Sequence, residues 1–149
     1  MVGYPEAEAI DTQQFFRLSV DVFIPAALEQ MIGPGEAELL DCRVVAEGAN
    51  APLVPEAERR LLQREITVLP AVLCNCGGVA VSYFEWKQNR QAETWPLHRV
   101  DEELRTLITA AAKRVRQVSA EYQVNLRLGA YIAALQYISR VYRLRGIFP

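Results

Sequence analysis

The amino-acid sequence predicts an α/β protein in which a partial parallel sheet of three strands is followed by a helical C-terminal tail. Two patterns carry this prediction. In the first half, short apolar runs rich in β-branched residues alternate with segments of helical character. In the second half, apolar residues recur at helical spacing over two long stretches.

The three predicted strands cover residues 20–24, 43–46 and 66–69. Nearly continuous apolar strands separated by helices are typical of a parallel sheet that is covered on both faces. The connections between them are therefore expected to be right-handed crossovers. Three strands are few for such a sheet, which indicates that they belong to a larger one.

Helix signals lie before and between these strands. Asp11 and Gln14 have the spacing of a capping box and predict a helix that begins after Asp11. A helix is also expected over residues 26–32, where Gly33-Pro34-Gly35 would break it. Another is expected over residues 56–64, directly after Pro55, which suits a first helical turn.

The second half predicts two long helices after a loop around residues 90–97. Asp101 is placed to begin the first helix, and Gly146 to end the second. The first carries an apolar stripe at i, i+3, i+4, i+7 spacing, formed by Leu104, Leu107, Ile108, Ala111, Val115 and Val118. The second repeats the pattern with Tyr131, Leu135, Ile138 and Tyr142. Both stripes are interpreted as packing surfaces.

Composition excludes several classes of protein. Hydrophobic residues make up 51% of the 149 and charged residues 23%, as in an ordinary globular domain. A net charge of −2 gives no footprint for nucleic acid. No apolar stretch approaches the ~18 residues that a membrane span needs, and no secretory signal is visible at the start. We therefore expect a cytoplasmic protein that binds neither nucleic acid nor membrane.

Cysteine and histidine are too few to predict a disulfide framework or a metal site. Cys42, Cys74 and Cys76 are an odd number without an export signal, so reduced thiols are expected. The Cys-x-Cys spacing is too short for a zinc knuckle, and His98 is the only imidazole.

Small and amide side chains follow all three predicted strands. Pro25 and Ala26 come after the first, Gly48 and Asn50 after the second, and Asn75 after the third. Ligands of parallel α/β sheets bind beyond the carboxyl ends of the strands, and an amide offers one donor group and one acceptor. Two interpretations stay open: a ligand crevice, or residues that merely form turns.

Several of these motifs resemble the glutamate dehydrogenase family, which includes the leucine, phenylalanine and valine dehydrogenases. They are Glu47-Gly48-Ala49-Asn50, residues 21–29 and 127–131, and above all residues 75–89, which read Asn-Cys-Gly-Gly-Val-Ala-Val-Ser-Tyr-Phe-Glu-Trp-Lys-Gln-Asn. The resemblance runs over essentially the whole chain. The Ser-Tyr-Phe-Glu-Trp run is similar to the glutamate enzymes in particular.

The resemblance implies a fold, a coenzyme and a set of site residues. It implies that residues 1–90 form the second half of a Rossmann-like dinucleotide-binding domain, and that residues 91–149 form a C-terminal helical segment packed on it. The coenzyme would be NAD or NADP. By the same resemblance, the coenzyme-binding residues are Pro25, Ala26, Gly48, Asn50 and Asn75. Val79 and Ser82 match the part of the pocket that receives the side-chain carboxylate of the amino-acid substrate.

Other features limit what these residues could do alone. The chain departs from the family pattern at Leu53, Ala71 and Cys76, and it contains no Gly-x-Gly-x-x-Gly turn. Neither Lys87 nor Lys113 matches a family catalytic lysine, so no catalytic residue is assigned. We therefore expect the C-terminal portion of an NAD(P)-dependent amino-acid dehydrogenase, inactive by itself and weak in coenzyme binding.

The expected partners follow from the same reasoning. They are a complementary N-terminal dehydrogenase half, a small-molecule amino acid, or further copies of the chain. A two-fold dimer would hide either the apolar edge strand 20–24 or the stripe of the last helix. The alternative function is a non-catalytic binding or assembly module derived from the dehydrogenase domain.

Overall fold

The computed structural model describes residue 3 and residues 5–146, which form two compact units. The first unit is Met1–Val68 and the second is Leu69–Pro149. The first contains the sheet and the second is helical, so the predicted α/β fold with a helical tail is confirmed.

The sheet consists of β1 (Val22–Phe23), β2 (Val44–Ala46) and β3 (Thr67–Leu69), in the order β1-β2-β3. β1 and β2 are parallel, with Val22 opposite Val44 and Phe23 opposite Val45. Each strand lies where the sequence predicts it but is two or three residues long. Within the described chain β1 is an edge strand, and Val22 is 49% exposed.

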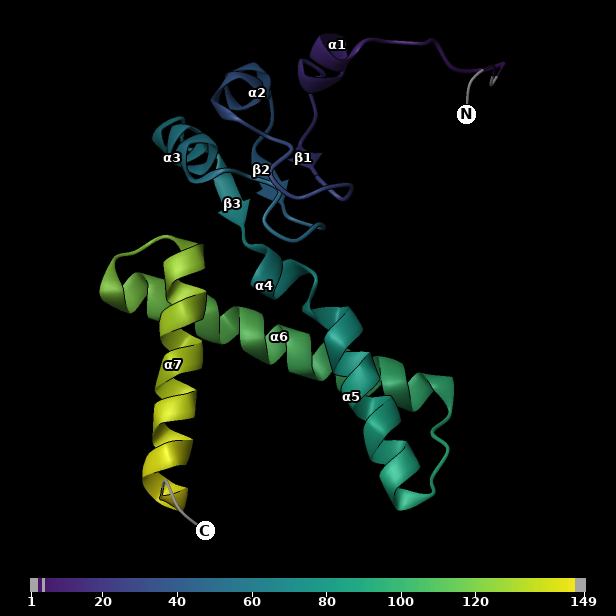
Figure 1. The fold of residues 1–149 in the computed structure, drawn as a ribbon, viewed down its shortest axis with the longest axis vertical. Helices are drawn as coiled ribbons and strands as arrows, with labels where there is room; N and C mark the ends of the chain where they lie inside the picture. Colours follow the sequence, from purple (N-terminus) through teal and green to yellow (C-terminus); the bar gives the residue numbers. More distant parts are fainter. Residues whose placement is uncertain (1–2, 4, 147–149) are drawn as a thin grey trace. The chain divides into compact units, whose positions relative to one another are not determined.

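Three helices accompany the strands in the first unit: α1 (Thr12–Phe16), α2 (Pro34–Leu39) and α3 (Pro55–Gln63). In Figure 1, α2 and α3 lie beside one another, next to the strands. The core of this unit is apolar, and it includes Ile32, Leu40, Val45 and Leu61, all at most 1% exposed.

The predicted capping box is confirmed. The Gln14 N–H donates to Asp11 Oδ1 at 2.7 Å, and the Asp11 N–H donates to Gln14 Oε1 at 2.8 Å. These two bonds satisfy two backbone groups that the start of a helix otherwise leaves unpaired.

The helix predicted over residues 26–32 is wrong. The backbone there pairs with a distant segment instead: the Gln30 N–H donates to the Ala51 carbonyl and the Ile32 N–H to the Pro52 carbonyl, at 2.8 and 2.9 Å. Gln30 also has a φ of 52°, outside the right-handed helical region. This non-local pairing overrides the local preference for a helix.

Gly33-Pro34-Gly35 does not end a helix but begins one. Gly33 is the N-cap of α2, and Pro34 occupies its first turn, where a missing N–H costs nothing. The Gly33 N–H donates to Glu36 Oε2 at 2.9 Å, which anchors this start.

The second unit contains α4 (Ala71–Cys74), α5 (Cys76–Gln91), α6 (Leu97–Tyr122) and α7 (Leu126–Arg145). α6 begins four residues before Asp101, so the predicted start was wrong. Its N-cap is Pro96, whose carbonyl accepts from the Arg99 N–H at 3.0 Å. Gly146 ends α7 as predicted.

The two predicted apolar stripes differ in outcome. On α6, Val115 and Val118 are buried, and the stripe packs as expected except for Leu107, which is 42% exposed. On α7, the four residues of the stripe are between 48% and 63% exposed, so the described residues do not cover this face. The face of α7 that is buried consists of Gly129, Ala130 and Ala133.

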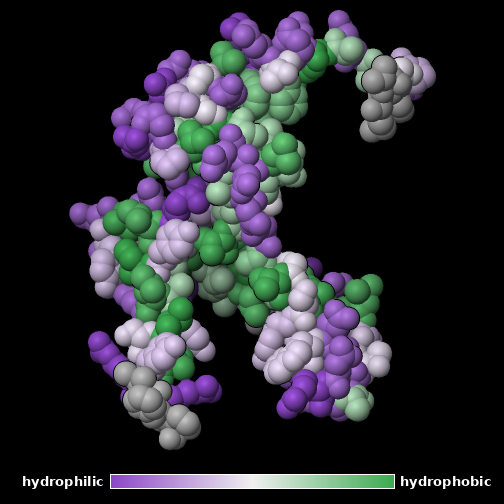
Figure 2. Space-filling view, viewed as in Figure 1, coloured by the Kyte–Doolittle hydropathy of each residue, from purple (hydrophilic) through white to green (hydrophobic). Residues whose placement is uncertain are grey.

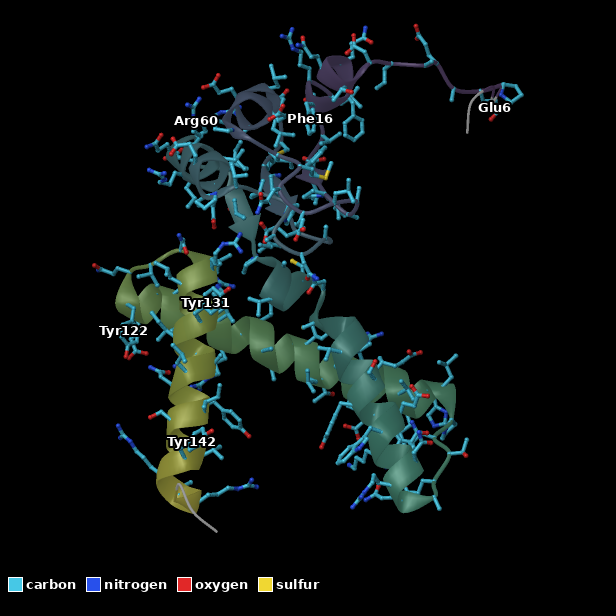
Figure 3. The ribbon with its side chains drawn as sticks, in the orientation of Figure 1. Glu6, Phe16, Arg60, Tyr122, Tyr131 and Tyr142 are labelled. Carbon is cyan, nitrogen blue, oxygen red and sulfur yellow. The ribbon has the colours of Figure 1, made fainter. Side chains whose placement is uncertain are left out.

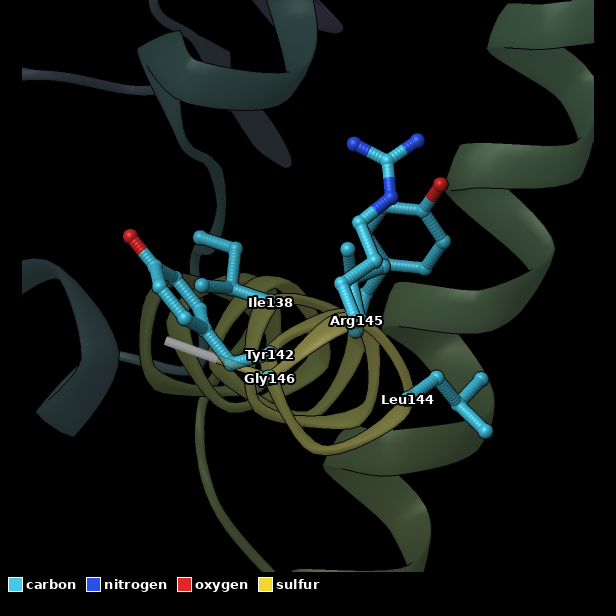
Figure 4. Close-up of a pocket in the computed structure, with 7 residues that line it drawn as sticks. Ile138, Tyr142, Leu144, Arg145 and Gly146 are labelled. Carbon is cyan, nitrogen blue, oxygen red and sulfur yellow. The ribbon is translucent and has the colours of Figure 1, made fainter. Parts of the chain in front are cut away.

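Figure 2 shows hydrophobic surface along α7, and Figure 3 labels Tyr131 and Tyr142 on it. Figure 4, a view along the end of α7, shows Ile138 and Tyr142 on one side of the helix.

Candidate functional site

The loops after β1 and β2 are joined by hydrogen bonds at the carboxyl end of the sheet. The Pro25 carbonyl accepts from the Gly48 N–H at 3.1 Å and from the Ala49 N–H at 2.8 Å. A Cβ added at Gly48 would lie 3.1 Å from the Ala26 Cβ and 3.4 Å from the Ile24 Cγ2. A side chain at this position would therefore have to displace its neighbours on the first loop by a few tenths of an ångström.

The structure thus brings Pro25, Ala26 and Gly48 together, as the crevice hypothesis requires. Pro25 is buried, Gly48 is half-buried and Ala26 is exposed. Asn50 follows on the same loop with an exposed side chain. The result is a backbone-rich surface with one amide beside it, which suits a flat ligand that contacts main-chain atoms.

Glu47 is a feature of this end of the sheet that the sequence reasoning missed. Its side chain is 0% exposed, although it directly follows the central strand. Charged side chains are rarely buried unless they are paired, and among the described residues no buried side-chain N or O atom is without a hydrogen-bond partner. The sequence feature that could have identified Glu47 is a carboxylate placed directly between an apolar strand and a glycine.

Asn75 lies at the junction of α4 and α5. It ends α4 and is the N-cap of α5, and its N–H donates to the Ala71 carbonyl at 2.9 Å. Val79 and Ser82 follow at i+4 and i+7, so all three residues lie on one face of α5. Asn75 is half-buried, Ser82 is exposed and Val79 is 71% exposed. This face carries an amide, a methyl surface and a hydroxyl.

Two glycines occupy the first turn of α5, and their surroundings differ. A Cβ at Gly77 would meet Ile108 Cδ1 at 3.5 Å, whereas a Cβ at Gly78 would meet no atom within 4 Å. Glycine inside a helix costs roughly 1 kcal/mol relative to alanine. Packing within the described chain gives no reason for this cost at Gly78. The open backbone there fits a group that approaches the amides from outside, as an anion does at a helix N-terminus.

Two thiols flank Asn75. The Cys76 thiol donates to the Leu73 carbonyl at 3.0 Å, and Cys74 is exposed. Cys42, Cys74 and Cys76 are all free thiols in the structure. Within residues 5–146, no three His, Cys, Asp or Glu side chains come together in a way that could hold a metal ion.

None of the helices among the described residues is both long enough and apolar enough to cross a bilayer.

Comparisons with known proteins agree on one family. The sequence model of the Glutamate/Leucine/Phenylalanine/Valine dehydrogenase family matches residues 2–146. Glutamate dehydrogenase of Thermotoga maritima is 42% identical over 149 residues, which are 100% of this chain and 36% of that protein. NADP-specific glutamate dehydrogenase A1 of Halobacterium salinarum is also 42% identical, over 99% of this chain and 36% of its own length.

Solved structures give the same result. Glutamate dehydrogenase of Peptoniphilus asaccharolyticus has a TM-score of 0.79 at 38% identity, with 84% of this chain and 32% of that chain covered. The hetero-hexameric glutamate dehydrogenase of Thermus thermophilus, in a leucine-bound form, has a TM-score of 0.85 at 32% identity, with 92% and 33% covered.

The fold defines an α/β protein with a Rossmann-like parallel sheet, and its small-residue strand ends suit a flat ligand. The chain belongs to the Glutamate/Leucine/Phenylalanine/Valine dehydrogenase family. The predicted resemblance is therefore confirmed. The chain spans about a third of the length of the curated relatives that it matches.

Proposed function

We propose that this chain is the C-terminal portion of an NAD(P)-dependent glutamate dehydrogenase. Residues 1–90 would supply the second half of the dinucleotide-binding domain, and residues 91–149 the C-terminal helical segment. The observation that carries the proposal is the 42% identity, over all of this chain, to a protein named glutamate dehydrogenase. The placement of Asn75, Val79 and Ser82 on one helix face supports it further.

The coenzyme would bind at the small residues that follow the strands. A nicotinamide coenzyme supplies a hydride acceptor or donor. Pro25, Ala26 and Gly48 would let its ring approach the backbone, and Asn50 and Asn75 would offer their amides to a carboxamide or a ribose hydroxyl. Relatives of both specificities occur, since the Halobacterium protein is NADP-specific and a Peptoniphilus protein NAD-specific.

Ser82 and Val79 would contact the amino acid. The Ser82 hydroxyl would donate a hydrogen bond to the side-chain carboxylate of glutamate, and the first turn of α5 would favour that charge through its backbone amides. Val79, which is mostly exposed, would cover the methylene groups. In this proposal the chain binds and orients the reactants, and no residue in it is assigned a proton-transfer role.

The alternative is a non-catalytic binding or assembly module. The departures from the family pattern favour it only weakly. Leu53 and Ala71 are both buried, with exposed fractions of 6% and 7%, so these two side chains contribute to packing within the chain. Leu53 belongs to the core of the first unit. The exposed apolar face of α7 is the observation that favours an assembly role.

The substrate assignment is tested with Ser82→Ala. The purified chain is combined with a separate polypeptide that covers the remaining two thirds of a family member, and glutamate oxidation is measured. A lost hydrogen bond to a charged group costs about 1.5–3 kcal/mol, so kcat/KM for glutamate should fall about 10- to 100-fold. The KM for the coenzyme should stay nearly unchanged.

Thr109→Ala is the matched control, because it removes an exposed hydroxyl from α6. It should leave both parameters unchanged. Equal losses for glutamate and coenzyme in Ser82→Ala would place Ser82 outside the substrate pocket.

Coenzyme affinity of the chain alone should be weak, millimolar or worse. The pyrophosphate of a dinucleotide usually binds the Gly-x-Gly-x-x-Gly turn at a helix N-terminus, and these 149 residues contain no such turn. Calorimetric titration with NAD and with NADP measures this directly. Micromolar binding would show that the coenzyme contacts have been assigned wrongly.

A further inference from the structure

Among the described residues, five residues other than glycine have a left-handed backbone, with φ between 44° and 60°. This conformation is uncommon for a residue with a side chain, because the Cβ then lies too close to the backbone. Three of the five are at helix ends, where it is ordinary: Ala92 and Gln123 are the C-caps of α5 and α6, and Glu65 follows the C-cap of α3. The other two, Gln30 and Ala51, end no helix.

Gln30 and Ala51 are hydrogen-bonded to each other. The Gln30 N–H donates to the Ala51 carbonyl at 2.8 Å. The two residues belong to the segments that follow β1 and β2 (Figure 1), and these segments pair again at Ile32, whose N–H donates to the Pro52 carbonyl at 2.9 Å. The Gln30–Ala51 bond and the two left-handed residues that it joins are named the loop clamp.

The loop clamp holds the segment that carries Asn50. Asn50 directly precedes Ala51 and is exposed. The residues on either side of this short segment lie in the interior, since Glu47 is 0% exposed and Pro52 less than 2%. Asn50 is therefore an exposed amide on a segment that is anchored at both ends and fixed next to the amide by a long-range hydrogen bond.

A strained backbone persists only where the surrounding structure determines it, and such residues cluster at ligand-binding positions. We propose that the loop clamp positions the Asn50 amide for the coenzyme, so that Gln30 and Ala51 are positioning residues of the coenzyme site. This inference rests on the proposed function, which makes Asn50 a coenzyme contact. An amide that is already held in its binding orientation loses less conformational entropy on binding, so the clamp strengthens coenzyme affinity.

Gln30→Val tests the clamp. Valine is β-branched and strongly disfavoured at positive φ, and it is smaller than glutamine, so it opposes the left-handed backbone without adding bulk. Gln30→Asn is the conservative variant, because asparagine adopts the left-handed region more readily than most residues. Gln123→Val is the matched control, since Gln123 is also an exposed glutamine with a φ of 54°, but it ends α6. Circular dichroism should show unchanged helix content in all three.

Amide hydrogen exchange of the chain alone measures whether the clamp holds the loop. In Gln30→Val, the Ile32 amide should exchange about 5- to 30-fold faster than in the wild type, because the left-handed conformation becomes harder to maintain. Gln30→Asn and Gln123→Val should leave this rate unchanged. The measurement does not depend on the proposed dehydrogenase function.

Kinetics of the chain combined with a polypeptide that covers the remaining two thirds of a family member measures the effect on the coenzyme. In Gln30→Val, the KM for the coenzyme should rise about 3- to 10-fold, while kcat and the KM for glutamate stay within about 2-fold. Gln30→Asn and Gln123→Val should keep the wild-type KM for the coenzyme. A purely structural role of Gln30 would lower the amount of active protein, and hence the apparent kcat, without changing this KM.

An unchanged KM for the coenzyme in Gln30→Val, together with faster exchange, would overturn the positioning role. So would a Gln30→Asn variant with the same rise in KM as Gln30→Val, because the side chain rather than the backbone would then be responsible. Unchanged exchange in Gln30→Val would show that the clamp does not hold the loop. A wild-type mixture without activity would instead overturn the proposed function, and the coenzyme role of the clamp with it.

Discussion

At the residue scale, Gly129 allows α6 and α7 to approach each other closely, because it has no side chain. A Cβ built at Gly129 would overlap Ser119 Oγ and would lie 3.1 Å from both Ser119 Cβ and the Val115 carbonyl oxygen. The hydroxyl could rotate away, but the backbone carbonyl cannot move without shifting the helix. Glycine is therefore needed at this position because a side chain would clash with α6, and not because the backbone must be flexible there.

Gly129→Ala should destabilise the chain by about 1–2 kcal/mol. Overpacking a close contact typically costs about 1–3 kcal/mol, and the better helix propensity of alanine returns up to about 1 kcal/mol. Denaturant unfolding followed by circular dichroism measures the difference. Removing the nearest clashing atom with Ser119→Ala in the same chain should recover part of the loss.

Gly78→Ala is the control for this prediction. The Cβ at Gly78 would meet nothing within 4 Å, so this variant should be at least as stable as the wild type. A Gly129→Ala variant as stable as Gly78→Ala would contradict the packing role of Gly129.

Cys42 gives the chain a pH dependence. Burial raises the pKa of the Cys42 thiol, and this outweighs the lowering effect of the nearby Arg64 guanidinium. The folded state therefore favours the neutral thiol. Its contribution to the free energy of unfolding is fully present below the ordinary thiol pKa and is lost as the pH rises through the raised value.

Stability should thus fall in alkaline solution more in the wild type than in Cys42→Ala. Urea unfolding of both chains between about pH 7 and about pH 10 measures this difference. Parallel curves over that range would show that the thiol titrates equally in the folded and unfolded states.

At the scale of elements, local signals predict some helix ends correctly, although the start expected at Asp101 lies four residues after the first residue of α6, Leu97. The Asp11–Gln14 capping box and the stop at Gly146 depend on residues within four positions, and both are confirmed. The segment 26–32 depends on hydrogen bonds to residues 51–54, which lie outside any local window. Sequence periodicity could not detect that pairing, and the predicted helix was wrong for this reason.

Arg64 makes another long-range connection between elements. Its guanidinium donates to the carbonyls of Ala37 at 2.5 Å, Glu38 at 3.3 Å and Leu40 at 2.7 Å, and so it caps the end of α2 from the end of α3. Cations and hydrogen-bond donors stabilise the C-terminal carbonyls of a helix. No sequence rule assigns this role to an arginine more than twenty positions away.

Arg64→Ala should lower the free energy of unfolding by about 1–3 kcal/mol, because it leaves several carbonyls without their donor. Arg59→Ala is the matched control, since Arg59 makes a surface ion pair with Glu56 on the same helix and should matter by less than about 1 kcal/mol. Thermal or urea unfolding compares the two. Equal losses of unfolding free energy in Arg64→Ala and Arg59→Ala would mean that Arg64 contributes only as a surface charge and not through its hydrogen bonds to the end of α2.

At the scale of the whole molecule, the sequence predicts the fold class better than it predicts which apolar faces are exposed. The strand-end glycine and proline are brought together as expected, because both follow strands of one parallel sheet. The stripe on α7 was expected to be packed, but periodicity shows only that a face is apolar. It does not show whether the chain itself contains the surface that covers that face.

The proposed function treats these 149 residues as part of a site that is complete only with further dehydrogenase sequence. No residue among them is assigned a catalytic role. In enzymes generally, orientation of the reactants and proton transfer together contribute several kcal/mol to the lowering of the reaction barrier. The chain alone is therefore expected to lack most of that rate enhancement. The chain also spans only about a third of its relatives' length.

The most direct test is the initial rate of glutamate-dependent reduction of NAD or NADP by the highly purified chain. It is measured with and without a polypeptide that covers the remaining two thirds of a family member. No measurable turnover is expected from the chain alone, and coenzyme reduction is expected when both polypeptides are present. Robust turnover by the 149-residue chain alone would contradict the proposed function.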